Sequence, residues 1–273
     1  MPPSRASDRP RPERFAGLHH VDSGTVELVP DRAHPGGWSV RLNGLASSYV
    51  HVDDPTLLDF EYTQWTGHVL DAVAPPGEPL SVLHLGGAGC TLARYVAATR
   101  PGSPQTVFEI DAALASLMRQ AFGLRSVRGL RIKAMDALEG LRALPDDYSA
   151  VVIRDAFDGA DVPPHLADLS FYASVARVLT PGGVYVGNVA DTAQVREARV
   201  EAATALEEFP HVAMIAEPGQ LRGRRYGNVI LVASQQPLPE DALIRKLAGG
   251  AVRARYVEPD RVKALVAGVK PRR

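Results

Sequence analysis

The stretch Ser81-Val-Leu-His-Leu-Gly-Gly-Ala-Gly-Cys-Thr91 decides the fold of this chain. Its apolar first half predicts a buried strand, its glycines predict a turn, and a helical pattern follows. A second apolar segment, Thr106–Ile110, contains Glu109 near its end. Strand, glycine turn, helix, strand and acid in this order are typical of a nucleotide-type cofactor site. In such sites the glycines let the backbone approach the ligand, and the acid accepts hydrogen bonds from ribose hydroxyls.

Apolar segments continue to alternate with helical patterns as far as residue 236. We expect strands at 82–85, 106–110, 130–133, 150–154, 184–189, 212–217 and 228–233. This alternation predicts a mainly parallel sheet with helices on both faces. The last two strands are joined by residues 218–227, which lack helical periodicity, so the sheet is expected to end in an antiparallel hairpin. The sequence therefore predicts an α/β fold, with a Rossmann-like catalytic domain over residues 80–236.

The flanking segments differ from this pattern. Residues 18–73 are expected to form a small N-terminal β-hairpin region and a linking helix. Asn43-Gly44 is a strong hairpin signal because both positions of a type I′ turn need a positive φ. Residues 1–17, rich in Pro, Arg and Ser, are predicted to be a disordered tail, and residues 237–273 a helical tail.

The composition is that of a soluble globular protein, with 45% hydrophobic and 22% charged residues. A net charge of −1 creates no field that would draw the chain to nucleic acid or to an acidic membrane. No apolar run is long enough to span a bilayer. The single cysteine, Cys90, excludes an internal disulfide and a cysteine-based zinc site, and no metal is expected. We therefore expect a cytoplasmic protein without nucleic-acid or membrane partners.

Acidic residues follow consecutive strands of the predicted sheet. They are Glu109, Asp136 and Asp155, with Asp158 three residues further on. Because ligands of open parallel sheets bind beyond the carboxyl ends of the strands, these acids are expected to meet at one edge. Each acid taken alone is as typical of a helix cap or a solvated residue as it is of a ligand site. Together they indicate a ligand site, in which Glu109 suits a ribose diol and Asp136 suits the exocyclic amine of an adenine.

Asp155 and Asp158 are the candidates for the reaction. Two carboxylates in one loop can hold a cationic amine, and one of them can accept the proton that the amine must lose before it attacks. A sulfonium donor of the S-adenosylmethionine type carries its own leaving group, so the protein mainly positions the reactants. NAD is less favoured, because a dinucleotide needs a pyrophosphate cradle and Gly86–Gly89 does not continue as a regular G-x-G-x-x-G motif.

The order of several motifs between about residues 25 and 235 resembles the spermidine synthase-like family, the aminopropyltransferase branch of the class I methyltransferase fold. The matching segments are Leu42-Asn-Gly44, Phe60-Glu-Tyr62 with His68, Gly86–Leu92, Glu109-Ile-Asp111, Asp136-Ala137, Asp155-Ala-Phe-Asp158, Phe171-Tyr172 and Leu179-Thr-Pro-Gly-Gly183.

The resemblance implies that S-adenosylmethionine, or its decarboxylated form, binds one set of residues. They are Gly86, Gly87, Ala88, Gly89, Glu109, Ile110, Asp136, Ala137 and Asp155. It also implies that Asp155 is the catalytic base, that Asp158, Tyr62 and His68 contact an amine substrate, and that the chain forms a homodimer through its N-terminal β region. Taken without the resemblance, His68 is more typical of a structural residue. His165 could equally lie over the site or at the surface.

The departures from the family pattern concern the amine side of the site. Ala88 stands where the family holds an Asp, which suits the free amino end of the decarboxylated donor and would repel the carboxylate of ordinary S-adenosylmethionine. Ser47 replaces an expected Gln, and Thr63-Gln64 replaces a His-Glu pair. The first hypothesis is therefore an S-adenosylmethionine-dependent transferase that methylates an amine or another small nucleophile. The alternatives are a polyamine aminopropyltransferase and a nucleoside-binding homologue without turnover.

Overall fold

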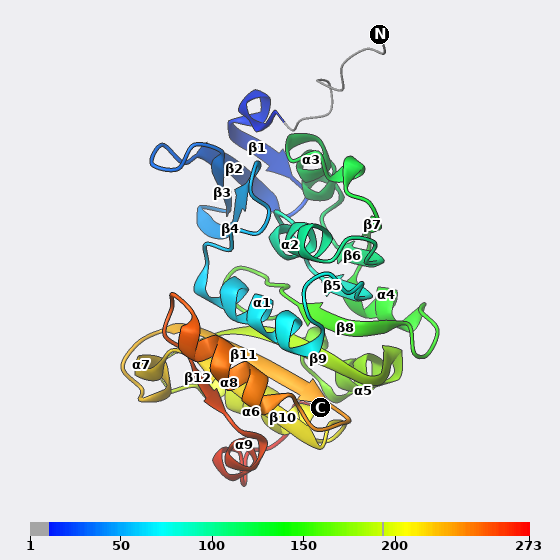
Figure 1. Cartoon of the computed structure of the whole chain (residues 1–273), viewed down its shortest axis with the longest axis vertical. Helices are drawn as coiled ribbons and strands as arrows, with labels where there is room; N and C mark the ends of the chain where they lie inside the picture. Colours follow the sequence, from blue (N-terminus) through cyan, green and yellow to red (C-terminus); the bar gives the residue numbers. More distant parts are fainter. Residues whose placement is uncertain (1–10, 193) are drawn as a thin grey trace.

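The computed structural model describes residues 11–192 and 194–273 (Figure 1). Within these residues, a four-stranded antiparallel sheet in the order β1-β2-β3-β4 forms the N-terminal part. Its strands are β1 (Gly17–Val21), β2 (Gly24–Pro30), β3 (Gly37–Leu42) and β4 (Leu45–His51). Asn43 and Gly44 join β3 to β4 with φ values of 50° and 81°, so the predicted type I′ hairpin is present.

The described residues also form an eight-stranded sheet in the order β12-β10-β11-β9-β8-β5-β6-β7. Its parallel strands are β5 (Val82–Leu85), β6 (Gln105–Glu109), β7 (Leu130–Ala134), β8 (Ser149–Arg154) and β9 (Leu179–Asp191). Its antiparallel strands are β10 (His211–Ala216), β11 (Gly227–Ser234) and β12 (Arg255–Val257). The chain order reverses between β5 and β8, and a crevice at such a point is where ligands of open α/β sheets bind.

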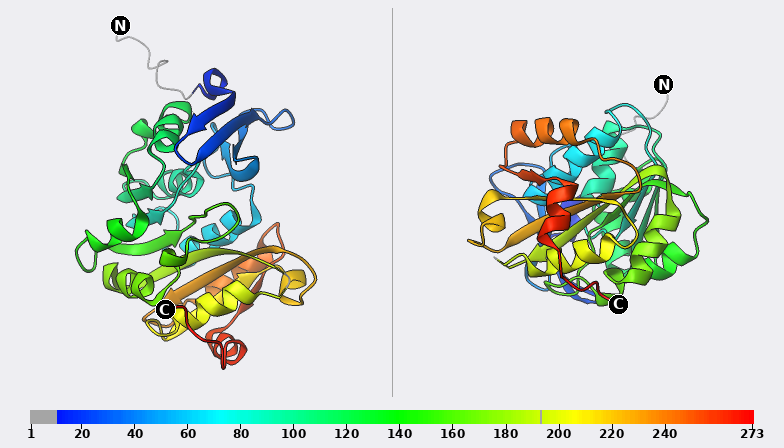
Figure 2. Two further views of the ribbon diagram at one scale, coloured as in Figure 1. Left: turned by 180° about the vertical axis from the view of Figure 1, so that it is seen from behind. Right: turned by 90° about the horizontal axis from the view of Figure 1, so that it is seen from below.

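Helices cover both faces of this sheet (Figure 2). The helices are α1 (Glu61–Val73), α2 (Thr91–Thr99), α3 (Ala112–Ala121), α4 (Ala137–Arg142), α5 (Leu169–Val178), α6 (Arg196–Ala205), α7 (Pro218–Leu221), α8 (Glu240–Gly249) and α9 (Pro259–Leu265), with 3₁₀ turns η1 (Pro12–Phe15), η2 (Leu124–Ser126) and η3 (Pro164–Leu166). One apolar core joins α1, α2 and α8 to the sheet, and a second joins α4, α5, α6 and α9 to its other face. A third core packs the N-terminal sheet against α2, α3 and β6.

The predicted α/β class, the mainly parallel sheet and the antiparallel end are confirmed. The flanks differ in detail. The N-terminal region is a sheet of four strands within the described chain rather than one hairpin, and η1 and β1 occupy part of the expected disordered tail. Residues 1–10 of that tail lie outside the described residues.

Two segments near the C-terminus contain structure that their sequence did not indicate. Residues 218–227 were expected to be a loop but begin with the short helix α7. The tail, expected to be helical, also contains β12, whose Tyr256 and Val257 are buried where the strand pairs with the edge of β10. Three residues are too few to show the alternating pattern that predicts a strand. The strand forms because it pairs with β10, which is distant in sequence. Among residues 11–192 and 194–273, no helix has the length and apolarity needed to cross a membrane.

Candidate functional site

The loop after β5 carries a backbone that other parts of the chain approach closely. Gly86 has a φ of 82°, and a Cβ built on it would lie 2.5 Å from the carbonyl oxygen of Asp155. A Cβ on Gly87 would lie 2.8 Å from the side chain of Val107 in β6, and one on Gly89 would lie 2.9 Å from Cβ of Ser48 in β4. The glycines are therefore needed because three other strands pack around this loop, which leaves its main-chain groups close to the crevice.

Glu109 ends β6 with its carboxylate directed at this loop. Its Oε2 accepts hydrogen bonds from the main-chain N–H groups of Gly87 and Ala88 at 3.2 and 3.3 Å, and its Oε1 accepts one from Asp111 at 3.1 Å. Burial raises the pKa of Glu109, and these main-chain donors partly oppose the shift. A carboxylate has about four lone-pair sites and these three donors use three of them, so Glu109 can still accept a hydrogen bond from a diol.

Asp136 lies at the carboxyl end of β7 and caps helix α4. Its Oδ1 accepts from the N–H groups of Leu138 and Glu139 at 2.8 and 3.1 Å. Its Oδ2 lies 2.9 Å from Nε2 of His165, which stands on η3. Asp136 therefore does cap a helix, as the sequence left open, but the cap uses only its Oδ1. His165 lies against the edge of the sheet, which sequence reasoning could not decide, because its position depends on the path of a long loop.

Asp155 follows β8 and is the most enclosed acid of the site. Tyr62 on α1 donates to its Oδ2 at 3.0 Å, and Asn188 on β9 donates to its Oδ1 at 3.0 Å. Burial raises the pKa of Asp155, while the hydrogen bonds from Asn188 and Tyr62 lower it. Burial also holds the pKa of Tyr62 well above its usual value, so Tyr62 stays a phenol that donates. Asn188 was not predicted, although a polar residue in the apolar strand beside β8 could have been noticed.

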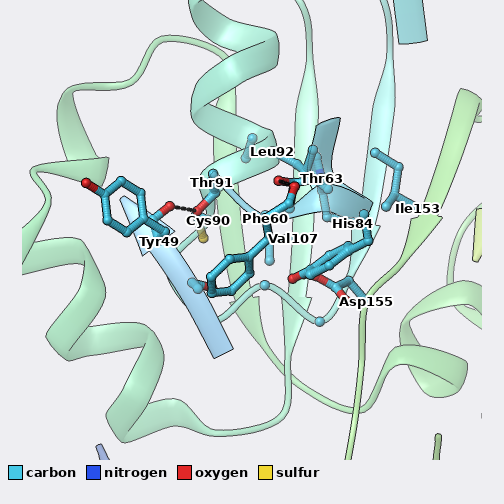
Figure 3. A pocket seen from close by; sticks show the side chains of 15 residues that line it. Tyr49, Phe60, Thr63, His84, Cys90, Thr91, Leu92, Val107, Ile153 and Asp155 are labelled. Atoms are coloured by element: carbon cyan, nitrogen blue, oxygen red, sulfur yellow. Dashed lines mark hydrogen bonds between the residues drawn. The ribbon is translucent and has the colours of Figure 1, made fainter. Parts of the chain in front are cut away.

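A pocket lies between Asp155 and the glycine loop (Figure 3). Its lining includes Ser48, Tyr49, Phe60, Tyr62, Thr63, His84, Gly86, Gly87, Cys90 and Asp155. The N-terminal sheet is held against this pocket, because Gly89 donates to Ser48 Oγ at 3.2 Å and Thr91 donates to the carbonyl of Tyr49 at 2.8 Å. The N-terminal sheet is thus one wall of the site.

Two buried side chains in this lining are held in their neutral forms. His84 bonds Gln105 at 2.9 Å, and burial lowers its pKa to about 4. Burial raises the pKa of the Cys90 thiol to about 12. Neither group is therefore a charged partner for a ligand at neutral pH.

Three residues expected in the site lie elsewhere or face solvent. Asp158 is exposed in a turn closed by main-chain hydrogen bonds with Asp161. Ile110 follows Glu109 and is 69% exposed. His68 lies against Gly250 beyond α8, since a Cβ built on that glycine would come within 2.9 Å of His68 Nε2. The structure therefore brings together Gly86, Gly87, Tyr62 and Asp155 at the pocket, with Glu109 and Asp136 along the same edge. In the described part of the chain, no group of three or more His, Cys, Asp or Glu residues is placed to hold a metal ion.

Comparison with known proteins finds a relative that matches nearly all of this chain. The chain matches no model of a known protein family. It is 36% identical to a probable spermidine synthase from Corynebacterium glutamicum ATCC 13032, whose crystal structure superposes with a TM-score of 0.87 over 94% of this chain and 95% of that one. The human methyltransferase-like protein 13, solved in complex with SAH, shares 22% identity and a TM-score of 0.54 over 70% of this chain and 94% of its own, a likeness of fold alone.

Two curated relatives carry the same family relationship at lower identity. A polyamine aminopropyltransferase from Vibrio vulnificus (strain CMCP6) is 24% identical over 176 residues, which are 63% of this chain and 56% of that protein. Another from Chromobacterium violaceum (strain ATCC 12472) is 22% identical over 189 residues, 69% of this chain and 67% of that protein. The match therefore spans little more than half of the Vibrio protein. The sequence identity with the Corynebacterium protein and the shared fold show that this chain belongs to the spermidine synthase-like family.

Proposed function

We propose that this chain is an aminopropyltransferase, which moves the aminopropyl group of decarboxylated S-adenosylmethionine to a small amine. The observation that carries the proposal is the environment of the Asp155 carboxylate. This carboxylate is half-buried at the carboxyl end of β8, held by Tyr62 and Asn188 on one side and beside the glycine loop on the other. The curated relatives, named as polyamine aminopropyltransferases, support this transfer more than methyl transfer.

The residues present fit the donor. Because the Cβ positions of Gly86, Gly87 and Gly89 are filled by other parts of the chain, this loop packs through its bare backbone, and its main-chain groups stay close enough to the crevice to contact a ligand chain. Glu109 would hold the ribose hydroxyls, and Asp136 and the main chain of Ala137 would hold the adenine, with Ile110 exposed beside them. When bound, the donor supplies a carbon activated by a positive sulfur, whose bond to that carbon breaks as the amine nitrogen bonds to it.

The chain's own part in the reaction is to orient the amine and to take its proton. Asp155 accepts the proton from the ammonium form, and its raised pKa makes it a better base than an exposed aspartate. Asn188 Oδ1 is buried and has no hydrogen-bond partner among the described residues, so it leaves a second acceptor beside Asp155. A primary amine has the donors that such a pair of acceptors requires.

Methyl transfer from ordinary S-adenosylmethionine is the second candidate, and Ala88 is the observation that favours it. A carboxylate at this position would attract the free amino end of the decarboxylated donor, and Ala88 offers none. Ala88 also has a φ of 32°, a conformation that Asp and Asn adopt more readily than Ala.

Product analysis with both donors decides between these functions. The purified chain is incubated with either donor and a panel of diamines, and the nucleoside products are identified by mass spectrometry. Aminopropyl transfer predicts amine-dependent release of 5′-methylthioadenosine from the decarboxylated donor. Release of S-adenosylhomocysteine instead would establish methyl transfer. Binding of either nucleoside product without turnover of any amine would indicate a homologue that has lost activity.

Ala88→Asp is expected to shift donor preference toward the decarboxylated form by about tenfold or more. The new carboxylate would attract the donor's amino end and repel a donor carboxylate, and one such charge contact is worth about 1.5–3 kcal/mol. The measurement is the ratio of kcat/KM values for the two donors. Ala88→Asn, which has nearly the same shape without the charge, is the control and should leave the ratio close to that of the parent. An unchanged ratio in Ala88→Asp would mean that residue 88 does not face the end of the donor.

Tyr62→Phe is expected to move the acid limb of the pH–kcat profile to higher pH. The Tyr62 hydroxyl stabilises the ionised form of Asp155, so its removal raises a pKa that burial has already raised. Activity should then be lost at a higher pH as the pH falls through that value. Thr63→Val, a change of similar size on the same helix, should leave the limb in place. A limb that does not move in Tyr62→Phe would show that another group controls it.

A further inference from the structure

Arg154, the last residue of β8, is fully buried, and its guanidinium contacts three other elements. Its Nη1 lies 2.8 Å from Glu201 Oε2 on α6 and donates to the main-chain oxygen of Leu166 at 2.9 Å. Its Nη2 donates to the main-chain oxygen of Asn188 at 2.9 Å. Successive side chains of a strand point to opposite faces, so Arg154 lies behind the site while Asp155 lies within it.

The two carbonyls that Arg154 holds belong to segments that support the site. Leu166 follows His165, whose ring contacts Asp136. Asn188 donates its side-chain N–H to Asp155. Asn188 also lies one residue beyond Gly187, which forms the last β8–β9 pair with Arg154. The guanidinium of Arg154 therefore bonds β9 to β8 just past the point where the main-chain hydrogen bonds between the two strands end.

The contacts of this ion pair indicate that it positions its neighbours in addition to any effect on overall stability. Burial is the largest single influence on the pKa of Arg154 and would lower it, but the Glu201 carboxylate, together with Tyr185 and Tyr172, raises the pKa above its usual value and keeps the guanidinium charged. A buried ion pair is often replaced by apolar residues without loss of stability. The carbonyls of Leu166 and Asn188, however, need donors, because unpaired buried polar groups are costly. Tyr172, also fully buried, donates to Glu201 Oε2 at 3.0 Å and so orients the pair.

We propose that Arg154, held by Glu201 and Tyr172, is a positioning residue that fixes Asn188 against Asp155 and His165 against Asp136. One guanidinium thereby sets the distance between the reacting end of the site and the end assigned to the adenine. The effect on catalysis rests on the proposed function, whereas the effect on nucleoside binding does not depend on turnover.

The chain contains a matched control for this ion pair. Arg100 is also fully buried, and its Nη2 lies 2.5 Å from Asp71 Oδ1 on α1. Arg154→Met is expected to lower kcat by about 100-fold, because a displacement of about 1 Å in a reacting group costs that much. Arg100→Met should lower Tm without this loss of kcat. Arg154→Lys restores a charge beside Glu201 but cannot hold both carbonyls, so it should recover Tm and not kcat.

A milder pair of variants keeps the test valid if the arginine variants do not fold. Tyr172→Phe removes the hydroxyl that orients Glu201, and Tyr95→Phe removes the hydroxyl that bonds Asp71 at 3.2 Å in the control pair. Tyr172→Phe should lower kcat by about tenfold with little change in the KM of the amine, while Tyr95→Phe stays within about twofold of the parent.

Binding of 5′-methylthioadenosine, measured by calorimetry, separates failure of this inference from failure of the proposed function. The inference predicts weaker binding in the Arg154 and Tyr172 variants than in the Arg100 and Tyr95 variants, even if the parent chain turns over no amine. Equal losses of kcat and of nucleoside affinity in the two pairs, at equal loss of Tm, would overturn it and leave Arg154 with a role in stability alone.

Discussion

Asp155→Asn is expected to lower kcat by about 10²- to 10⁴-fold, the usual contribution of a positioned general base. The amide has the shape of the carboxylate but cannot take the proton of the attacking ammonium. Steady-state kinetics with the amine and the sulfonium donor measure the change. The affinity for the nucleoside should be nearly unchanged, because Glu109 and Asp136 remain in place.

This loss of activity should not be accompanied by a loss of stability. Burial raises the pKa of Asp155, which means that its ionised form is less favourable in the folded chain than in the unfolded chain. Replacing it with a neutral side chain therefore removes a destabilising charge at neutral pH, and the Tm of Asp155→Asn should equal or exceed that of the parent. A variant that keeps its kcat within about twofold would show that Asp155 is not the base.

Glu109→Ala is expected to weaken binding of 5′-methylthioadenosine by about 10- to 100-fold. A charge-assisted hydrogen bond is worth about 1.5–3 kcal/mol, and the ribose diol would lose at least one. The variant also leaves the N–H groups of Gly87 and Ala88 without the acceptor that they have in this structure. Isothermal titration calorimetry measures the dissociation constant.

Glu109→Gln separates these two effects. The amide oxygen can still accept from the glycine loop, while the negative charge that strengthens the bonds to the diol is lost. We expect its affinity to lie between those of the parent and Glu109→Ala. If both variants bind as tightly as the parent, the ribose does not contact β6.

The parts of the site that the sequence predicted depend on local rules. Strand β5 with its glycines, Glu109 at the end of β6 and Asp155 at the end of β8 follow from apolar runs and the residues directly after them. Their meeting follows from the parallel order of the strands, because the carboxyl ends then lie at one edge. The Asn43-Gly44 turn is likewise fixed by two residues whose conformation few others adopt.

The parts that were missed depend on contacts between distant segments. Asn188 reaches Asp155 from β9, and His165 reaches Asp136 across a loop, so neither pairing can be read from spacing. The position of His68 could have been questioned from the sequence. At 3.6 residues per turn, residues six apart on α1 point about 120° away from each other, so Tyr62 and His68 do not share a face.

The most direct test of the account is a crystal structure of the chain with 5′-methylthioadenosine. We predict that the ribose hydroxyls bond to Glu109, that the adenine lies by Asp136, and that the sulfur lies between the glycine loop and Asp155. A nucleoside bound away from this edge of the sheet, or one whose sulfur points away from Asp155, would contradict the account.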